Sequence, residues 1–285
     1  MENLAHSSAF AAAEPAYDAD SVTPVAVLPT QFSDPRRVAL KFRPLKALHH
    51  FRELIKDKEN TEEVFHIFES LPNRDFVPSA RAFTASPRGE AIRASEPHLP
   101  PILDDHAALR RFPVGTVAHA YCDFMEREGL SSQGLVDEFE KFRGDRPRYD
   151  DLLDWYSNRN RDTHDLLHVL TGYGRDALGE QCVLAFTYSQ NPSLANLFIA
   201  YAGGANMRRM VKKTGAPIFA AIREGQKLGK ACPRVSEMAI RELLAMPLEA
   251  ARAKFGITPP KHYVKAHAAL RAAGVDPYDL LAKAA

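Results

Sequence analysis

Residues 151–190 read DLLDWYSNRNRDTHDLLHVLTGYGRDALGEQCVLAFTYSQ, and their apolar side chains recur every three to four residues over 151–170 and again over 177–188. That period places the apolar side chains on one face of an α-helix, whereas a half-buried strand alternates apolar and polar residues. Gly172, Gly174 and Gly179 follow the first stretch, and we expect these glycines to break the helix and let the chain turn. The stretch therefore predicts two helices joined by a glycine-rich turn.

The same helical period recurs through most of the chain. Toward the N-terminus it predicts two amphipathic helices, over 45–55 and 61–68, the second with a capping start at Asn60. Further helices are predicted over 105–112, 116–128, 135–142, 193–202 and 207–228, and three or four short ones over 233–285. Convincing alternating strands are absent, so we predict an all-α protein, an irregular multi-helix bundle.

Two segments lack this period. Residues 1–38 begin with Ala, Ser, Pro and acidic side chains and show no repeating apolar face, so we predict a disordered or extended N-terminal tail. Residues 83–101 contain Pro87, Gly89, Pro97, Pro100 and Pro101, which predicts a linker or a long surface loop. We expect residues 39–285 to form a single all-helical domain.

Composition excludes several classes of protein. The chain has 37 Lys and Arg against 36 Asp and Glu, a net charge of +1, so no global basic field exists and we expect no nucleic-acid partner. The first twenty residues contain no Lys or Arg, which secretory and transit peptides require. The longest apolar stretch, 182–202, is interrupted by polar residues, so we predict no membrane-spanning segment. The three cysteines form no CxxC pair, which is typical of a reducing compartment, and we expect Cys122 and Cys182 to be buried.

The sequence HDxxH places His164 and His168 four residues apart, and Glu180 follows twelve residues later. On a helix, side chains at i and i+4 rise from the same face one turn apart, so the two imidazoles can share one cation. The glycine-rich turn lets Glu180, at the start of the next helix, bring a carboxylate back toward them. We therefore predict a divalent metal site with ligands on two adjacent helices.

Two features of this site stay open at the level of sequence. Asp165 lies about 100° around an ideal helix from His164, so it is either a further ligand or a carboxylate that orients an imidazole. Two histidines with one or two carboxylates suit zinc with an open position, and equally suit iron(II) or another first-row metal. An alternative interpretation is a hydrolytic zinc site, in which the shorter Asp165 replaces the Glu of HExxH and sits farther from a bound water.

The motif resembles the signature of the coenzyme Q (ubiquinone) biosynthesis protein four family. Its residues here are Arg159-x-Arg161-x-x-His164-Asp165-x-x-His168-Val169-Leu170-Thr171-Gly172, followed by Gly179-Glu180. Residues 113–125, PVGTVAHAYCDFM, resemble the LPxGT, Tyr and Phe-Met segment of that family. Residues 243–263, with LLAMPL, FGI, Pro259-Pro260 and Tyr263, resemble its C-terminal motif. The resemblance covers about 103–263.

This resemblance implies an α-helical protein of ubiquinone biosynthesis that acts on polyprenylated rings derived from 4-hydroxybenzoate. Two roles are attached to the family, and we favour metal-dependent C1 decarboxylation coupled to hydroxylation over a metal-stabilised, lipid-binding scaffold that organises the biosynthetic complex. Zinc is the metal that the resemblance implies. The partners implied are the polyprenylated quinone precursor, other ubiquinone-biosynthesis proteins, the membrane surface and further copies of the chain in a homo-oligomer. We expect a cytoplasmic protein held peripherally at the inner membrane.

Arginines flank the metal motif, and we expect Arg161 to be catalytic together with Asp165. Arg159, Arg161 and Arg175 either clamp a substrate carboxylate or form salt bridges with Asp162 or Asp176. Residues 207–230 carry seven Lys and Arg against one Glu, which favours contact with anionic lipid or an ordinary solvated surface. A polyprenyl tail needs a long apolar groove. The candidates for its wall, or for plain core packing, are Val183, Leu184, Phe186, Leu194, Leu197, Phe198, Ile199 and Tyr201.

Overall fold

The computed structural model describes residues 30–58 and 60–280, and these residues contain helices but no strand. The nearest approach to a sheet among them is a single antiparallel bridge between Thr116 and Pro247. The prediction of an all-α protein is therefore confirmed. Of the tail predicted over 1–38, residues 1–29 lie outside the described residues.

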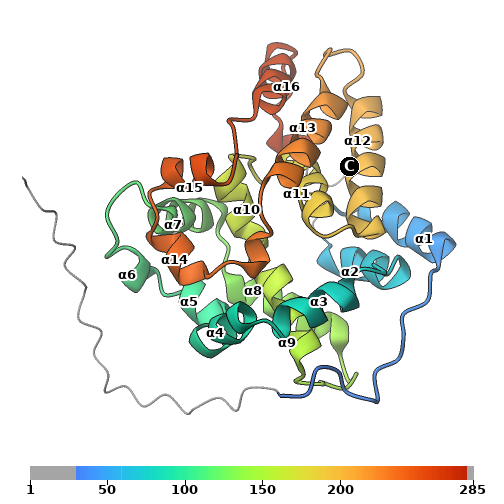
Figure 1. Cartoon of the computed structure of the whole chain (residues 1–285). Helices are drawn as coiled ribbons and strands as arrows, with labels where there is room; N and C mark the ends of the chain where they lie inside the picture. Colours follow the sequence, from blue (N-terminus) through green and yellow to red (C-terminus); the bar gives the residue numbers. More distant parts are fainter. Residues whose placement is uncertain (1–29, 59, 281–285) are drawn as a thin grey trace, which may run out of the picture.

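The helices are 4 to 17 residues long and are joined by turns and loops (Figure 1). In chain order they are α1 (Pro44–Leu54), α2 (Thr61–Ser70), α3 (Phe76–Thr84), α4 (Pro87–Ser95), α5 (Pro100–Leu103), α6 (His106–Leu109), α7 (Val117–Glu128), α8 (Ser132–Arg143), α9 (Leu152–Asp162), α10 (His164–Thr171), α11 (Ala177–Gln190), α12 (Leu194–Met210), α13 (Ile218–Ala231), α14 (Ile240–Ala245), α15 (Leu248–Lys254) and α16 (Lys261–Ala272), with 3-10 turns η1 (Val235–Glu237) and η2 (Tyr278–Leu280).

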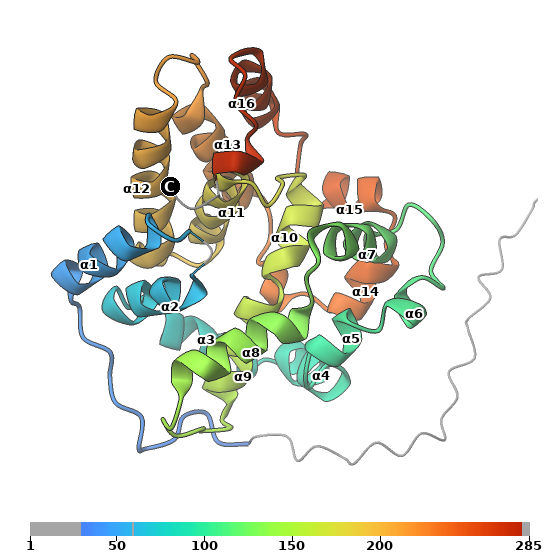
Figure 2. The same cartoon turned by 180° about the vertical axis from the view of Figure 1, so that it is seen from behind.

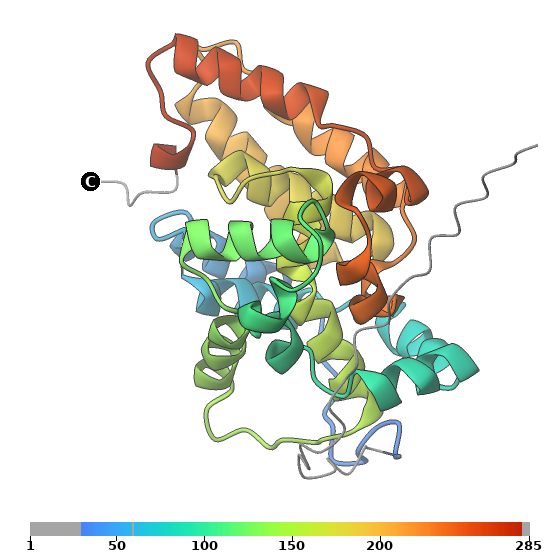
Figure 3. The same cartoon turned by 90° about the vertical axis from the view of Figure 1, so that its left-hand side faces the viewer.

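Helix α11 is the centre of the largest group of helices. It packs against α12 and α13, and α16 lies along α13 (Figures 1 and 3). Helix α10 lies between this group and a second one made of α7, α14 and α15, and it contacts α7, α11 and α15 (Figure 2). The two helices predicted to carry the metal ligands, α10 and α11, therefore meet where the two groups join.

Three apolar cores hold the helices together. The largest joins α7, α10, α11, α13 and the C-terminal helices, and includes the fully buried Tyr121 and Phe186. A second joins α1, α2 and α12 through Ile67 and Ile199, and a third joins α3, α4 and α9 through residues such as Trp155. Burying one large apolar side chain stabilises the folded state by about 1.5–3 kcal/mol, so each core holds its helices in place.

The prediction of a linker or long surface loop over 83–101 is wrong. Residues Pro87–Ser95 form α4, and α5 follows it. Ser86 caps α4, because its hydroxyl accepts a hydrogen bond from the Gly89 N–H at 3.0 Å. Pro87 occupies the first turn, where the N–H that proline lacks is not needed. The prolines that were expected to break helices therefore stand at the start of helices here.

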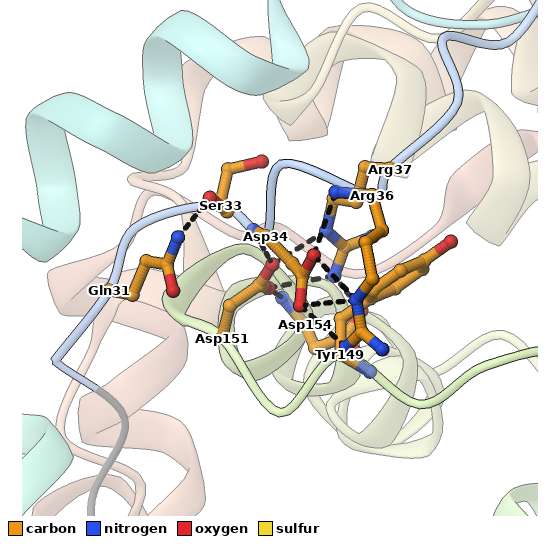
Figure 4. Close-up of polar contacts among 8 residues, drawn as sticks. All are labelled: Gln31, Ser33, Asp34, Arg36, Arg37, Tyr149, Asp151 and Asp154. Atoms are coloured by element: carbon orange, nitrogen blue, oxygen red, sulfur yellow. Dashed lines mark hydrogen bonds and ion pairs between the residues drawn. The ribbon is translucent and has the colours of Figure 1, made fainter.

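The first described residues, 30–43, form no helix and cross the N-terminus of α9 (Figure 4). Asp151 caps α9 by accepting from the Asp154 N–H at 2.8 Å, and it also accepts from the Asp34 N–H at 2.7 Å. The Arg37 guanidinium donates twice to the Asp151 carboxylate, at 2.6 and 2.7 Å. The segment thus fixes the start of α9, the helix that leads into the metal motif.

Among the described residues, no helix combines the length and the apolar character that crossing a bilayer requires. The apolar stretch 182–202 is divided between α11 and α12. The α11 half contributes Cys182, Val183, Ala185 and Phe186 to the largest core, and the α12 half contributes Ala195 and Ile199 to the second core.

Candidate metal centre

Helices α10 and α11 bring His164, His168 and Glu180 together. Nε2 of His168 lies 3.5 Å from Oε1 of Glu180, and Nε2 of His164 lies 3.9 Å from Oε2. The potential ligand atoms of the three residues all lie within 4.8 Å of one another. The His168 side chain is buried, whereas those of His164 and Glu180 are 27% and 26% exposed. Two nitrogens and one oxygen therefore face a common point that is open on one side.

The break between α9 and α10 and the contacts of the His168 ring determine how the two histidines are placed. Residues 151–170 are not one helix, because α9 ends at Asp162 and Thr163 joins it to α10. Nδ1 of His168 lies 3.1 Å from the Tyr173 carbonyl oxygen, and its ring stacks on Phe124 at a centroid distance of 5.3 Å. An imidazole that donates through Nδ1 presents the lone pair of Nε2, which is the atom that faces Glu180.

The turn between α10 and α11 determines the position of Glu180. Gly172 ends α10 with a left-handed φ of 75°, as the glycine pattern predicted. The prediction that Gly179 also breaks the helix is wrong, because Gly179 lies in the first turn of α11. A Cβ at Gly179 would lie 1.9 Å from the Gly174 carbonyl oxygen, so a close backbone approach requires glycine there. Glu180 follows in the same turn, where the helix dipole favours a carboxylate.

A buried polar network ties this turn to α16. The Asp176 carboxylate caps α11, accepts the Tyr263 hydroxyl hydrogen and lies 3.1 Å from Nε2 of His267. The Tyr263 hydroxyl in turn accepts from the Gly174 N–H at 2.9 Å. Burial alone would raise the pKa of Asp176, but His267 and Tyr263 lower it. Sequence reasoning missed this network, because no local pattern connects residues 87 positions apart.

Charge is balanced inside the ligand group. Burial alone would lower the pKa of His168, but the negative charge of Glu180 raises it to about 9. Burial would likewise raise the pKa of Glu180, and the charges of His168 and His164 lower it instead. Without a metal, the group therefore favours a carboxylate beside an imidazolium, and an entering cation takes the place of that proton.

Asp165 and Glu180 face different ring nitrogens of His164. Oδ1 of Asp165 is 3.3 Å from Nδ1 of His164, whereas Nε2 of His164 faces Glu180. Burial would raise the pKa of Asp165, but the contact with His164 lowers it, so Asp165 favours its charged form. A carboxylate on the far ring nitrogen of a ligating histidine fixes the orientation of the ring.

The donor set fits a divalent first-row ion. Two imidazole nitrogens and one carboxylate oxygen, with one side open, are used by catalytic zinc sites and by non-haem iron(II) sites. The contact of His168 with the Tyr173 carbonyl and that of His164 with Asp165 supply the outer partners that such ligands usually have.

A cavity of about 2590 Å³ opens beside this group and includes His164, Asp165 and Glu180 in its wall. It continues between α1, α2, α8, α9 and the first described residues. Of the predicted apolar wall, Leu184, Leu194 and Ile199 line the cavity, whereas Val183 and Phe186 are fully buried in the core. Apolar side chains that line it elsewhere are Val38, Leu40, Phe42, Phe51, Leu54, Val64, Phe68, Phe139 and Trp155.

The three flanking arginines have different surroundings. Arg159 is buried and pairs with the buried Glu96 at 2.8 Å, an ion pair that the sequence did not indicate. Arg161 pairs with Asp162 at 2.7 Å, as one of the two sequence interpretations held, and it lies in the cavity wall. Arg175 also lies in the cavity wall, and its charge helps to lower the pKa of Asp165.

The basic segment 207–230 is interrupted, because α12 ends at Met210 and α13 begins at Ile218. The turn between them is rich in exposed cations, and α13 buries Ile218 and Ile222 while its cations face outward. The exposed cations are Arg208, Arg209, Lys212, Lys213, Arg223, Lys227 and Lys230.

Comparison with known proteins gives a family match for this chain. A family model described as "Coenzyme Q (ubiquinone) biosynthesis protein Coq4" matches residues 79–261. The match begins well before the stretch 103–263 that carries the motif resemblance, and it includes α4 and α5.

Curated relatives agree with this match. The chain is 28% identical over 157 residues to the mitochondrial ubiquinone biosynthesis protein COQ4 of Pyricularia oryzae, covering 53% of this chain and 43% of that protein. It is 29% identical over 103 residues to the mitochondrial COQ4 homolog 2 of Culex quinquefasciatus, covering 36% of this chain and 43% of that protein. In both cases the match spans less than half of the relative.

The fold is similar to the crystal structure of a proposed ubiquinone biosynthesis protein from Nostoc punctiforme. The TM-score is 0.55 at 18% identity, and the similarity covers 76% of this chain and 100% of that chain. The family model covers well over half of the sequence and includes the whole His–Glu group. The chain therefore belongs to the coenzyme Q (ubiquinone) biosynthesis protein Coq4 family.

Proposed function

We propose that this protein catalyses C1 decarboxylation coupled to hydroxylation of a polyprenylated ring derived from 4-hydroxybenzoate, a step of ubiquinone biosynthesis. The observation that carries the proposal is the convergence of His164, His168 and Glu180 in the wall of a large cavity. A structural zinc ion is normally enclosed by four protein ligands, whereas a catalytic one keeps an open position. This group offers three ligands and is open on one side, which favours chemistry over scaffolding.

His164, His168 and Glu180 would hold the metal, which we propose is zinc by family resemblance, or iron(II) or another first-row ion by donor set. When bound, such an ion supplies Lewis acidity toward a ring carboxylate or phenolate and, for a redox-active ion, access to oxygen chemistry. In the overall reaction the bond from C1 to the carboxylate breaks and carbon dioxide leaves. The hydroxyl oxygen comes from molecular oxygen, and an external two-electron donor with protons reduces the second oxygen atom to water.

We assign the surrounding side chains to binding and proton transfer. Arg161 and Arg175, both in the cavity wall, would bind the ring carboxylate, since guanidinium groups pair with carboxylates through two parallel hydrogen bonds. Asp165 holds the His164 ring in place and, being charged, accepts a proton there. The hydrolytic alternative requires Asp165 to act on a bound water, whereas its carboxylate lies on the opposite ring nitrogen of His164.

The prenyl tail would lie along the apolar wall of the cavity. Leu184 and Ile199 line the wall on α11 and α12, and α1 and α2 contribute Phe51 and Phe68. Each buried CH₂ of the tail contributes about 0.8 kcal/mol, so a long apolar path binds a polyprenyl chain strongly.

We propose that the protein works at a membrane surface, where such a substrate resides. The exposed cations at the turn between α12 and α13 would meet anionic lipid headgroups. Val38, Leu40 and Phe42 line the cavity and remain 82%, 57% and 59% exposed, so they would offer the tail an apolar entrance. The same proposal includes peripheral attachment to the inner membrane from the cytoplasmic side. It also includes contact with other ubiquinone-biosynthesis proteins and assembly into a homo-oligomer.

Turnover by the purified protein tests the proposal. The substrate is a C1-carboxylated prenylphenol, supplied with labelled oxygen gas and a reductant, and the product is analysed by mass spectrometry. We expect the labelled C1-hydroxylated product from the metal-loaded protein and none from His164→Ala or Glu180→Ala. His262→Ala and Glu242→Ala are matched controls at exposed positions and are expected to retain activity.

The scaffold role predicts a different outcome. A protein that only organises the biosynthetic complex would bind the prenylphenol and pathway proteins and give no product under any metal loading. Such a result, obtained with zinc, iron(II) and manganese in turn, would overturn the enzymatic proposal.

A further inference from the structure

A second cluster of potential metal ligands lies between α6 and α7. It consists of His106, Cys122 and Glu126, whose ligand atoms lie within 4.8 Å of one another. Cys122 and Glu126 are four residues apart on α7, so their side chains share one face of that helix. His106 is the first residue of α6, and its Nδ1 is 3.0 Å from Oε1 of Glu126.

This cluster is separate from the His164 group. Helix α7 also carries Phe124, whose ring stacks on His168. Cys122 and Phe124 are two residues apart, which is about 200° around a helix, so they project from opposite sides of α7. The two groups therefore have no ligand and no ligand-bearing helix in common, and this inference does not rest on the proposed function.

The three side chains of the cluster differ in their exposure to solvent. Cys122 is fully buried, the His106 side chain is 26% exposed, and the Glu126 side chain is 52% exposed. An ion can therefore arrive from the Glu126 side and meet the sulfur at the closed end. Cysteine binds metals as a thiolate, so a cation that enters here takes the place of the Cys122 thiol proton.

Arg110 holds Glu126 in place without using the oxygen that faces His106. Its guanidinium donates to Oε2 of Glu126 at 2.7 Å and to Asp123 at 2.6 Å, whereas Oε1 of Glu126 faces His106. An ion bound between His106 and Glu126 would replace their mutual hydrogen bond and leave the contact with Arg110 intact. A ligating carboxylate that keeps an outer hydrogen-bond partner is the usual arrangement in metal sites.

We propose that His106, Cys122 and Glu126 form a second metal site, selective for zinc and chemically similar ions. Nitrogen, thiolate and carboxylate donors suit zinc or cobalt(II), whereas calcium and magnesium require oxygen donors. Binding releases the thiol proton of Cys122 to solvent, and water completes the coordination. Such an ion would fix α6 against α7.

Cobalt(II) is the probe, because a thiolate bound to cobalt gives a near-ultraviolet charge-transfer band. The His164, His168 and Glu180 group contains no sulfur, so cobalt bound there gives no such band. The experiment titrates the reduced full-length protein with cobalt(II) and follows this band. The variants are Cys122→Ser and Glu126→Gln, with Cys232→Ser and Glu128→Gln as matched controls.

We expect the band in the wild type and in both controls, and its loss in Cys122→Ser. Losing even an outer partner weakens metal binding by about 10- to 100-fold, so Glu126→Gln, which removes a ligand, is expected to weaken cobalt binding by at least about 100-fold. Because Glu126 is half exposed, its variant retains the fold even if serine at the buried position 122 does not. A wild type without the band, a band that persists in Cys122→Ser, or unchanged affinity in Glu126→Gln would overturn the proposal.

Discussion

The carbonyl oxygen of Gly174 lies 1.9 Å from the position that a Cβ on Gly179 would occupy. The turn that follows α10 and the first turn of α11 are thus in backbone contact. Glu180 is the next residue along α11, so this contact sets how close its carboxylate comes to His164 and His168.

Gly179→Ala is therefore expected to separate the turn from α11. An added methyl group in a packed interior typically costs about 1–3 kcal/mol, and here it meets backbone, which has little freedom to move. We expect a lower melting temperature, followed by circular dichroism, together with weaker zinc binding. Gly134→Ala is the control, since its Cβ would meet only the Ser131 hydroxyl at 3.1 Å. Equal stability of the two variants would contradict this account of the turn.

Tyr263→Phe tests the network that anchors the same turn. The change removes the donor to the Asp176 carboxylate and the acceptor for the Gly174 N–H. A buried polar group left without its partner costs about 1–3 kcal/mol, so we expect a loss of that size in the free energy of unfolding, measured by urea titration. Tyr201→Phe loses a hydroxyl that bonds Gln226 at a partly buried site and is expected to cost less. A greater loss in Tyr201→Phe would be inconsistent with an anchoring role for Tyr263.

Metal affinity should depend on pH through His168. Its pKa is raised from 6.5 to about 9 in the metal-free protein, chiefly because the charge of Glu180 outweighs burial. Below pH 9 a metal must displace this proton, so the apparent zinc affinity is expected to rise about tenfold per pH unit from pH 7 and to level off near pH 9. Competition with a chromophoric chelator measures the affinity in the Cys122→Ser background, which removes the sulfur ligand of the second site. An affinity that is constant between pH 7 and 9 would show that His168 carries no such proton.

The buried pair of Arg159 and Glu96 joins α9 to the chain just after α4. Removing one partner leaves a charge buried without its counterion, so Glu96→Ala is expected to destabilise the protein by about 3–5 kcal/mol. Glu90→Ala, at an exposed position of α4, is the control and is expected to change stability by less than about 0.5 kcal/mol. Chemical denaturation of both variants checks the difference, and a loss below about 1 kcal/mol in Glu96→Ala would be too small for a buried ion pair.

Sequence periodicity predicted the helical architecture and the residues that converge on one point. His164 and His168 could be predicted from the sequence because a spacing of four places them on one helical face. Glu180 could be predicted because glycines mark the turn before it. The sequence did not reveal α4, because its prolines occupy first-turn positions that look like breaks in a linear pattern. Side chains that meet from separate helices were also missed, since no local spacing relates Arg159 to Glu96, or His106 to the Cys122 and Glu126 pair on α7.

The metal content of the purified protein tests the central claim most directly. In a Cys122→Ser background, which removes the sulfur ligand of the second site, elemental mass spectrometry is expected to find about one divalent ion per chain. Adding Glu180→Ala or His164→Ala is expected to reduce the content to near zero while circular dichroism shows an unchanged helical protein. A full complement of metal in both double variants would contradict the assignment of His164, His168 and Glu180 as the metal centre.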